Sequence, residues 1–356
     1  MGLSYIMNGQ GFGDVASILL ASNMDPRALR PYTAEDGRTY IDRLMVQNGK
    51  QVEVPTLITN APATLTKNAW QHLDTAVLKA ARSELQLVND ILGAGLEYTL
   101  PNGMGTTVFQ TQDMTDSGSA HTSMDGITRG ERDRPEINLH NMPMPITFAD
   151  FDFTLREISV SKNTGAPLDT TQLEQNGRKI AEQLDSLFLG TAAQYTYGGG
   201  TLYGLTNHPD AIAATITSPT AGGWTPNTLI TEVIAMRQQA KLAFHRGPFR
   251  LYMGTSWDIY LDEDYSAAKG TNTLRQRMLA LDRISGVKTL DTLAGYTIIM
   301  VEMRQDVVRA VTGMNLVNVQ WETEGGMLLH FKTMIIQNPQ IRSDANGNTG
   351  LVVGTV

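Results

Sequence analysis

Six histidines are the residues of this chain best suited to ligate a metal or to transfer protons near neutral pH. They are His72, His121, His140, His208, His245 and His330. No two of them have the i,i+4 spacing that places two ligands on one face of a helix. His121 and His140 lie in polar loop sequence and His208 precedes Pro209 in a turn, so solvated or hydrogen-bonding roles are favoured over metal ligation.

Three other patterns resemble ion or phosphate sites, and each lacks part of its motif. The glycines of residues 9–13 have no preceding strand, which favours a flexible arm over a phosphate cradle. The turn at residues 344–348 has its glycine too early for a calcium loop and no closing Glu. The acidic run at residues 262–264 has no partner His or Lys beside it, which favours an exposed loop. The sequence therefore predicts no enzyme, and no catalytic, cofactor or metal site.

Composition excludes several further classes of function. The chain contains no cysteine, so disulfides, thiolate nucleophiles and Cys-ligated zinc are impossible. With 28 Lys+Arg against 36 Asp+Glu and no basic run, sequence-specific nucleic-acid binding is disfavoured. Charged residues make up 18% of the chain, below the roughly 25% of typical soluble domains, which indicates surface covered by a partner. Neither a secretion signal nor a membrane-spanning run is present, so a soluble protein made inside the cell is expected.

The pattern of apolar residues predicts an α+β chain whose helices and strands are segregated by region. We expect an arm over residues 1–65 that lies on other surfaces. The predicted helices run from Thr66 to Leu92, from Thr171 to Gly190, and from Thr225-Pro226 to a stop at Gly247. The predicted strands are Ile146 to Val160, Phe249 to Met253, Tyr296 to Val301, Val307 to Thr312, Leu316 to Trp321, and Met327 to Gln337.

A polar, turn-rich stretch from Asn102 to Met142 is too long for an ordinary connection and predicts a projecting functional loop. Its charged residues have both signs, which favours ion pairs with a neighbouring protein over binding of a polyanion. These candidate contact residues are Asp125, Arg129, Glu131, Arg132, Asp133, Arg134 and Glu136.

Three patches carry a resemblance to a known fold. The first comprises Phe153-Thr154-Leu155, Leu168-Asp169, Leu173, Lys179, Ala181, Asp185, Gly190 and Gly204-Leu205. The second is residues 247–253 with Trp257, and the third is Val317 to Pro339. Their order over about three quarters of the chain resembles the Hong Kong 97 type fold, which the major capsid proteins of tailed phages share with encapsulin shell proteins.

The resemblance implies a division of the chain. It implies an N-terminal arm at 1–65, a first long helix and connection of the peripheral domain at 66–102, and an extended loop at 103–145 that in this family lies over the adjacent subunit. It implies the peripheral domain with its spine helix 170–190 at 146–248, a mainly axial domain at 249–315, and closing strands with the C-terminus at 316–356.

The resemblance also implies a function. It implies a structural major capsid protein that self-assembles, through hexamers and pentamers, into an icosahedral shell around double-stranded DNA. The alternative is an encapsulin nanocompartment around a cargo enzyme, but the long arm favours the phage capsid. Implied partners are portal, scaffolding and cement or decoration proteins, with DNA enclosed without specific binding and no membrane. The implied location is the virion, assembled in the host bacterial cytoplasm.

The chain departs from some family members in two ways that affect how its subunits are joined and processed. Some relatives join neighbours covalently through a loop lysine bonded to an asparagine, but here no lysine occurs between Lys79 and Lys162. We therefore expect a shell held by non-covalent overlap. Because the chain begins at Met1 without a long scaffolding region, we expect no cleavage and a separate scaffolding protein.

Overall fold

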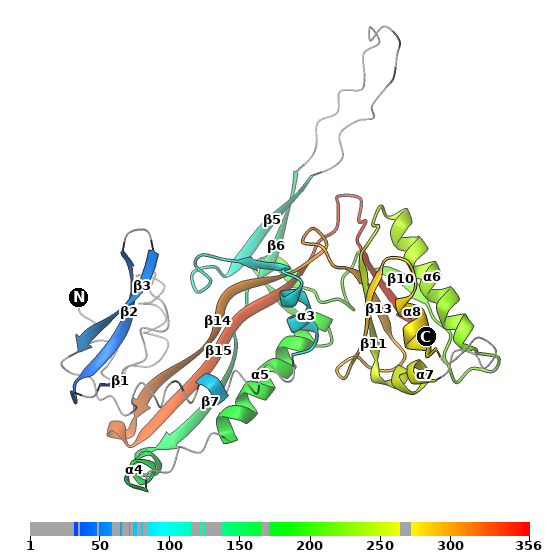
Figure 1. Cartoon of the computed structure of the whole chain (residues 1–356). Helices are drawn as coiled ribbons and strands as arrows, with labels where there is room; N and C mark the ends of the chain where they lie inside the picture. The colour runs from blue at the N-terminus through cyan, green and yellow to red at the C-terminus, as the bar shows by residue number, and fades with distance from the viewer. Residues whose placement is uncertain are drawn as a thin grey trace.

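The computed structural model describes residues 32–34, 36–47, 50–58, 65, 71, 74–76, 80, 85–114, 122, 124, 137–164, 171–263 and 272–356. Helices and strands are segregated into a long sheet with a helix along it, a second lobe around another sheet, and smaller strand ribbons (Figure 1). The chain is α+β, as predicted from the sequence.

The larger sheet is built on one long antiparallel pair, β14 (Val308–Thr323) and β15 (Leu328–Ile341). β7 (Thr147–Thr154) pairs with β15, and β4 (Glu97–Thr99) pairs with β14, which gives the order β4-β14-β15-β7. Helix α5 (Thr171–Leu189) runs along this sheet and packs against β7 and β15 (Figure 1). The two strands predicted over Val307 to Trp321 are thus one irregular strand.

Helix α5 confirms the prediction of a helix from Thr171 to Gly190. Its apolar residues recur at three- and four-residue steps, so one face of the helix is apolar. Leu173, Ile180, Leu184 and Phe188 on that face are buried, whereas the charged residues Glu174, Arg178, Lys179 and Glu182 are exposed.

An aromatic cluster closes one end of the larger sheet. The rings of Phe151 on β7 and Phe331 on β15 stack with their centroids 5.0 Å apart, and the Phe153 ring meets Phe331 edge-on at 5.7 Å. Tyr32 and Leu65 are buried in the same cluster. Tyr32 belongs to a small antiparallel sheet formed by β1 (Tyr32–Thr33), β2 (Thr39–Gln47) and β3 (Lys50–Ile58), so this cluster attaches the N-terminal sheet to the larger one.

The second lobe contains a five-stranded mixed sheet. Its strands, in spatial order, are β10 (Ile212–Thr215), β16 (Leu351–Thr355), β13 (Ile298–Glu302), β11 (Phe249–Gly254) and β12 (Ile284–Leu290). The outer pairs β10–β16 and β11–β12 are parallel, and the two inner pairs are antiparallel. Both faces are buried, so the sequence of β13 is a continuous apolar run instead of an alternating one.

Helices cover the two faces of this sheet differently. Side chains of one face pack with α6 (Pro226–Leu242), α7 (Asp258–Asp262) and α8 (Leu274–Leu279). Side chains of the other face pack with α3 (Leu87–Gly93) and with the C-terminal end of α5. The second contact joins the lobe to the larger sheet, and Asp90 on α3 reinforces it by accepting a hydrogen bond from Lys288 on β12 (2.5 Å).

Two small hairpins complete the described chain. β5 (Val108–Met114) and β6 (Ile137–Pro143) form an antiparallel ribbon that extends away from both larger sheets (Figure 1). β8 (Tyr195–Tyr197) and β9 (Gly200–Leu202) form a hairpin beside the base of that ribbon. The ribbon lies within the stretch for which the sequence predicts a projecting loop.

The prediction of one helix from Thr66 to Leu92 is wrong at its C-terminal part, because Leu85 and Gln86 are not helical and α3 begins after them. The backbone N–H of Gln86 donates to Asp185 Oδ2 on α5 (3.2 Å). A tertiary hydrogen bond thus satisfies a donor that an uninterrupted helix would direct to its own preceding turn.

The prediction of a strand from Ile146 to Val160 is also wrong in its second half, where α4 (Leu155–Thr164) follows β7. The Glu157 carboxylate accepts hydrogen bonds from the Thr154 N–H (2.8 Å) and hydroxyl (2.9 Å). The Glu157 N–H donates in return to the Thr154 hydroxyl (3.3 Å), which completes a capping box. These hydrogen bonds hold the pKa of Glu157 below its usual value.

Helix α6 starts as predicted, with Thr225 as its N-cap and Pro226 at its first position, but it ends at Leu242 and not at Gly247. Phe244 takes the left-handed conformation (φ 65°) that usually favours glycine at a helix end. The His245 N–H donates to the Ala240 carbonyl (2.9 Å), which closes the last turn. Sequence reasoning placed the stop at the nearest glycine and missed this aromatic residue in the same role.

A buried ion pair fixes the connection between α6 and β13. Glu302 Oε2 lies 2.5 Å from His245 Nδ1, and its Oε1 accepts the Gly247 N–H (2.9 Å), with Arg304 at 3.7 Å. Burial alone raises the pKa of Glu302, but the hydrogen bond and charge of His245, the charge of Arg304 and the Gly247 N–H together hold it below its usual value. Because the folded chain favours the charged carboxylate, this group stabilises the fold above the pKa of an unfolded Glu.

We expect Glu302→Gln to lower the free energy of unfolding at pH 7 by about 1.5–3 kcal/mol, because hydrogen bonds to a buried charged group are weakened or lost. The wild-type chain should lose this contribution as the pH falls through the depressed pKa, below about 4.3. The difference between wild type and variant should therefore shrink toward pH 3 in denaturant titrations of unassembled chain. Glu182→Gln, which removes an exposed pair with Arg178, is the control and should cost less than about 1 kcal/mol. A constant difference from pH 7 to pH 3 would contradict the assignment.

Candidate functional site

The seven charged residues predicted to contact a neighbour all lie within residues 125–136, outside the described part of the chain. Their role stays a prediction. What the structure does describe of this region is the β5–β6 ribbon and its base, and the candidate site is built from these residues.

The ribbon presents apolar side chains to solvent. Ile137 and Leu139 are two residues apart on β6, so they share one face, and their exposed fractions are 58% and 61%. Because these side chains are so exposed, they add little to the stability of the folded subunit. They mark a surface suited to contact with another protein.

Backbone contacts that only glycine permits hold the base of the ribbon. A Cβ at Gly200 in the β8–β9 hairpin would lie 1.9 Å from the Asn141 carbonyl oxygen on β6. A Cβ at Gly103, in the turn before β5, would lie 2.0 Å from the Gly313 oxygen on β14. The Asn141 side chain also donates to the Gly198 carbonyl (3.1 Å). The hairpin and the ribbon base are therefore in direct contact, without side chains between them.

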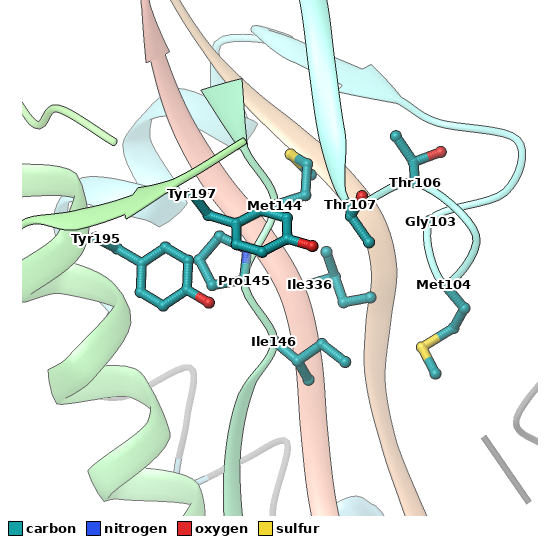
Figure 2. A pocket seen from close by; sticks show the side chains of 10 residues that line it. All are labelled: Gly103, Met104, Thr106, Thr107, Met144, Pro145, Ile146, Tyr195, Tyr197 and Ile336. Atoms are coloured by element: carbon teal, nitrogen blue, oxygen red, sulfur yellow. The ribbon is translucent and has the colours of Figure 1, made fainter. Parts of the chain in front are cut away.

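A pocket of about 190 Å³ opens where these segments meet. Figure 2 shows the rings of Tyr195 and Tyr197 on one side and Met104 on the other, with Ile146 and Ile336 between them. The complete lining is Gly103, Met104, Thr106, Thr107, Met144, Pro145, Ile146, Tyr195, Tyr197 and Ile336. The two tyrosines alternate on β8 and remain about half exposed, 46% and 53%.

The lining of this pocket is mainly apolar. Apart from the two tyrosine hydroxyls, it has no acidic or basic side chain. Apolar side chains with a few hydroxyl groups suit an apolar side chain of a partner. Tyrosine is enriched where proteins meet, because its ring packs while its hydroxyl stays hydrated.

The histidines within the described residues have structural partners. His330 contacts Asp152 through Nδ1 and the Thr323 hydroxyl through Nε2 (2.7 Å), and it stacks on Trp321. His208 packs edge-on against Tyr203, and burial lowers its pKa. His140 lies 3.0 Å from Asp113 on the ribbon, while His72 and His121 lie outside the described residues.

In the acidic run at 262–264 and the turn at 344–348, the carboxylates of Asp262 and Asp344 also have partners within the chain. Arg275, thirteen residues after Asp262 in the sequence, contacts both Asp258 (3.1 Å) and Asp262 (3.3 Å). The Asp344 carboxylate accepts hydrogen bonds from the Asn346 and Asn348 N–H groups of its own turn (2.9 and 2.7 Å). Among the described residues, no group of three or more His, Asp and Glu side chains is arranged to hold a metal. None of the helices described combines the length and apolar character needed to cross a bilayer.

Sequence reasoning missed the exposed aromatic residues that line this pocket. It recognised residues 195–204 as a glycine-rich turn but gave no role to Tyr195 and Tyr197. The available signal was two tyrosines at alternate positions directly before three glycines, which is the pattern of a hairpin with one aromatic face. Phe244, 80% exposed at the end of α6, carried no comparable signal.

Comparison with solved structures identifies the fold. A virus-like particle from Pyrococcus furiosus matches with a TM-score of 0.57 at 15% identity, over 80% of this chain and 99% of that one. The capsid of Myoviridae phage XM1 matches with a TM-score of 0.56 at 12% identity, over 75% and 92%. A structure from Mycobacterium phage Adephagia matches with a TM-score of 0.50 at 12% identity, over 75% and 90%. The chain has the Hong Kong 97 type capsid fold, and the resemblance noted in its sequence is confirmed.

The sequence itself places the chain in a family. It belongs to the family of unknown function DUF6260, whose model matches residues 60–354. A search among curated protein sequences found no match.

We expect Gly200→Ala to destabilise the chain by about 1–3 kcal/mol or more, because the added methyl group meets backbone that cannot yield cheaply. Gly222→Ala is the matched control, since a Cβ there has no neighbour within 4 Å, and it should change stability by less than about 1 kcal/mol. Denaturant unfolding of the unassembled chain measures both. Equal effects of the two substitutions would show that the hairpin does not depend on this close contact.

Proposed function

We propose that this chain is a structural shell protein, the major capsid protein of a tailed bacteriophage. Many copies assemble into an icosahedral shell that encloses double-stranded DNA. The observation that carries the proposal is the Hong Kong 97 type fold over most of the chain, shared with proteins from a phage capsid and a virus-like particle. The mainly apolar pocket at the ribbon base agrees with a structural role.

The projecting ribbon supports assembly through overlap. A specific interface needs to bury about 1,000 Å² or more, and a ribbon that reaches beyond its own subunit adds contact area that a compact lobe cannot supply. Ile137, Leu139 and the tyrosine pocket provide apolar groups on that surface. With no cysteine in the chain and no lysine from residue 80 to residue 161, these contacts are non-covalent.

The charge of the chain supports enclosure of DNA without specific binding. A formal net charge of -8 and the lack of a basic run make tight phosphate binding unfavourable, and weak binding leaves packaged DNA free to enter and leave. The proposed location is the virion, after assembly in the host cytoplasm. Portal, scaffolding and decoration proteins are the proposed partners besides further copies of the chain.

Particle formation tests the proposal directly. The purified full-length chain, alone or with a scaffolding protein, should form closed particles of uniform diameter in negative-stain micrographs and light scattering. Particles isolated from producing cells should protect DNA from nuclease until the shell is opened. Particles that hold an enzyme and no DNA would indicate a nanocompartment, and a stable oligomer of only a few subunits would contradict a shell of either kind.

We expect the double variant Tyr195→Ser/Tyr197→Ser to assemble poorly while its subunit stays folded. Loss of an interface hot spot costs about 2 kcal/mol, which is more than tenfold in an association constant. The subunit itself should lose no more than about 1 kcal/mol per substitution, because both side chains are half exposed. The double variant Tyr195→Phe/Tyr197→Phe keeps the rings and is the matched control. Sedimentation over a concentration series measures assembly, and wild-type behaviour of the serine variant would remove this pocket from the interface.

A further inference from the structure

Two arginines lie at the base of the ribbon, and among the described residues only one of them, Arg342, has a carboxylate within ion-pair distance. Arg309 on β14 lies with its guanidinium carbon 4.6 Å from the centre of the Tyr98 ring and 5.9 Å from that of Phe109. Its Nε donates to Gln340 Oε1 (2.6 Å). These partners are an amide and two aromatic rings, so they bind the cation without neutralising it.

Arg342, directly after β15, is the second cation. Its terminal nitrogen is 4.0 Å from Asp113 Oδ1 on β5, at the outer limit of an ion pair, and the other oxygen of Asp113 is taken by His140 (3.0 Å). Arg342 Nε is buried and has no hydrogen-bond partner among the described residues. A buried donor left without a partner costs stability until an acceptor reaches it.

The two guanidinium groups act on each other. Burial and the charge of Arg342 both hold the pKa of Arg309 below its usual value. Arg309 lies opposite Gln340, and the Arg342 N–H donates to the Val307 carbonyl, so the two arginines are two positions apart across the β14–β15 pair. Asp113 is the carboxylate that the described residues place beside Arg342, at 4.0 Å. The Arg342 side chain is about one third exposed, so an incoming anion has access from solvent.

We propose that Arg309 and Arg342 form a carboxylate-binding site at the ribbon base, which an acidic side chain of a second copy fills in the assembled particle. The fork of a guanidinium group matches a carboxylate, and an incoming carboxylate that accepts from the exposed part of this fork offsets the repulsion between the cations. A second copy is a suitable donor because this chain carries 36 Asp and Glu against 28 Lys and Arg. The choice of occupant rests on the proposed shell function, whereas the site itself does not.

Inorganic phosphate is the probe for the site. The unassembled full-length chain should show a higher unfolding temperature in sodium phosphate than in sodium chloride of equal ionic strength. Arg342→Gln should lose most of this rise, and Arg309→Gln should reduce it. Arg178→Gln, which alters an exposed arginine on α5, is the matched control and should keep the full rise. Arg342→Lys keeps the charge but not the fork and should retain only part of it.

The same variants then test the occupant. Arg342→Gln should raise the protein concentration needed for half-maximal particle formation several-fold, while Arg178→Gln leaves it unchanged. An equal phosphate response in wild type and Arg342→Gln would overturn the site, provided that circular dichroism shows both folded. A lost phosphate response with normal assembly would overturn the second copy as occupant. Failure of the wild type to form particles would defeat the proposed function and this occupant, yet the phosphate series would still decide on the site.

Discussion

The antiparallel pairing of β14 with β15 is the interaction on which the rest of the structure depends. It gives α5 a surface to pack on, and it gives β7 and β4 an edge each. Its register also positions the residues at the ribbon base. Arg309 lies opposite Gln340, and Gly103 contacts Gly313 at the point where the pairing is irregular. A shift of one residue along this pair would turn both features to the opposite face.

The apolar side chains of this protein divide into a buried set and an exposed set. Both faces of the five-stranded sheet and the apolar face of α5 are buried within the chain. Ile137, Leu139 and two tyrosines of the ribbon and its base stay exposed, as do Leu242, Phe244 and Ile259 of the second lobe. The hydrophobic effect drives each lobe to fold, but it leaves these exposed side chains in contact with water. The low proportion of charged residues agrees with a subunit whose exposed apolar surface is covered by neighbours.

Local signals failed where a distant group competed with them. The helical periodicity through Leu85 and Gln86 is genuine, yet Asp185, about one hundred residues away, accepts the N–H that the helix would use. The end of α6 is set by Phe244, because closure of the last turn by His245 outweighs the poor fit of a phenylalanine to the left-handed region. The error at Thr154 and Glu157 was different, since their capping box could have been read from the sequence.

The sequence by itself determined the fold class, the helix α5, most core strands, the exclusion of cysteine chemistry and the lack of a lysine from residue 80 to residue 161, because these follow from composition and from periodicity over neighbouring residues. Only the tertiary structure decided the candidate site. The tyrosine pocket joins residues from 103 to 336, and the arginine site joins residues from 98 to 342. Spacing along the chain carries no signal for such contacts, since they exist only after β14, β15 and the ribbon have been brought together.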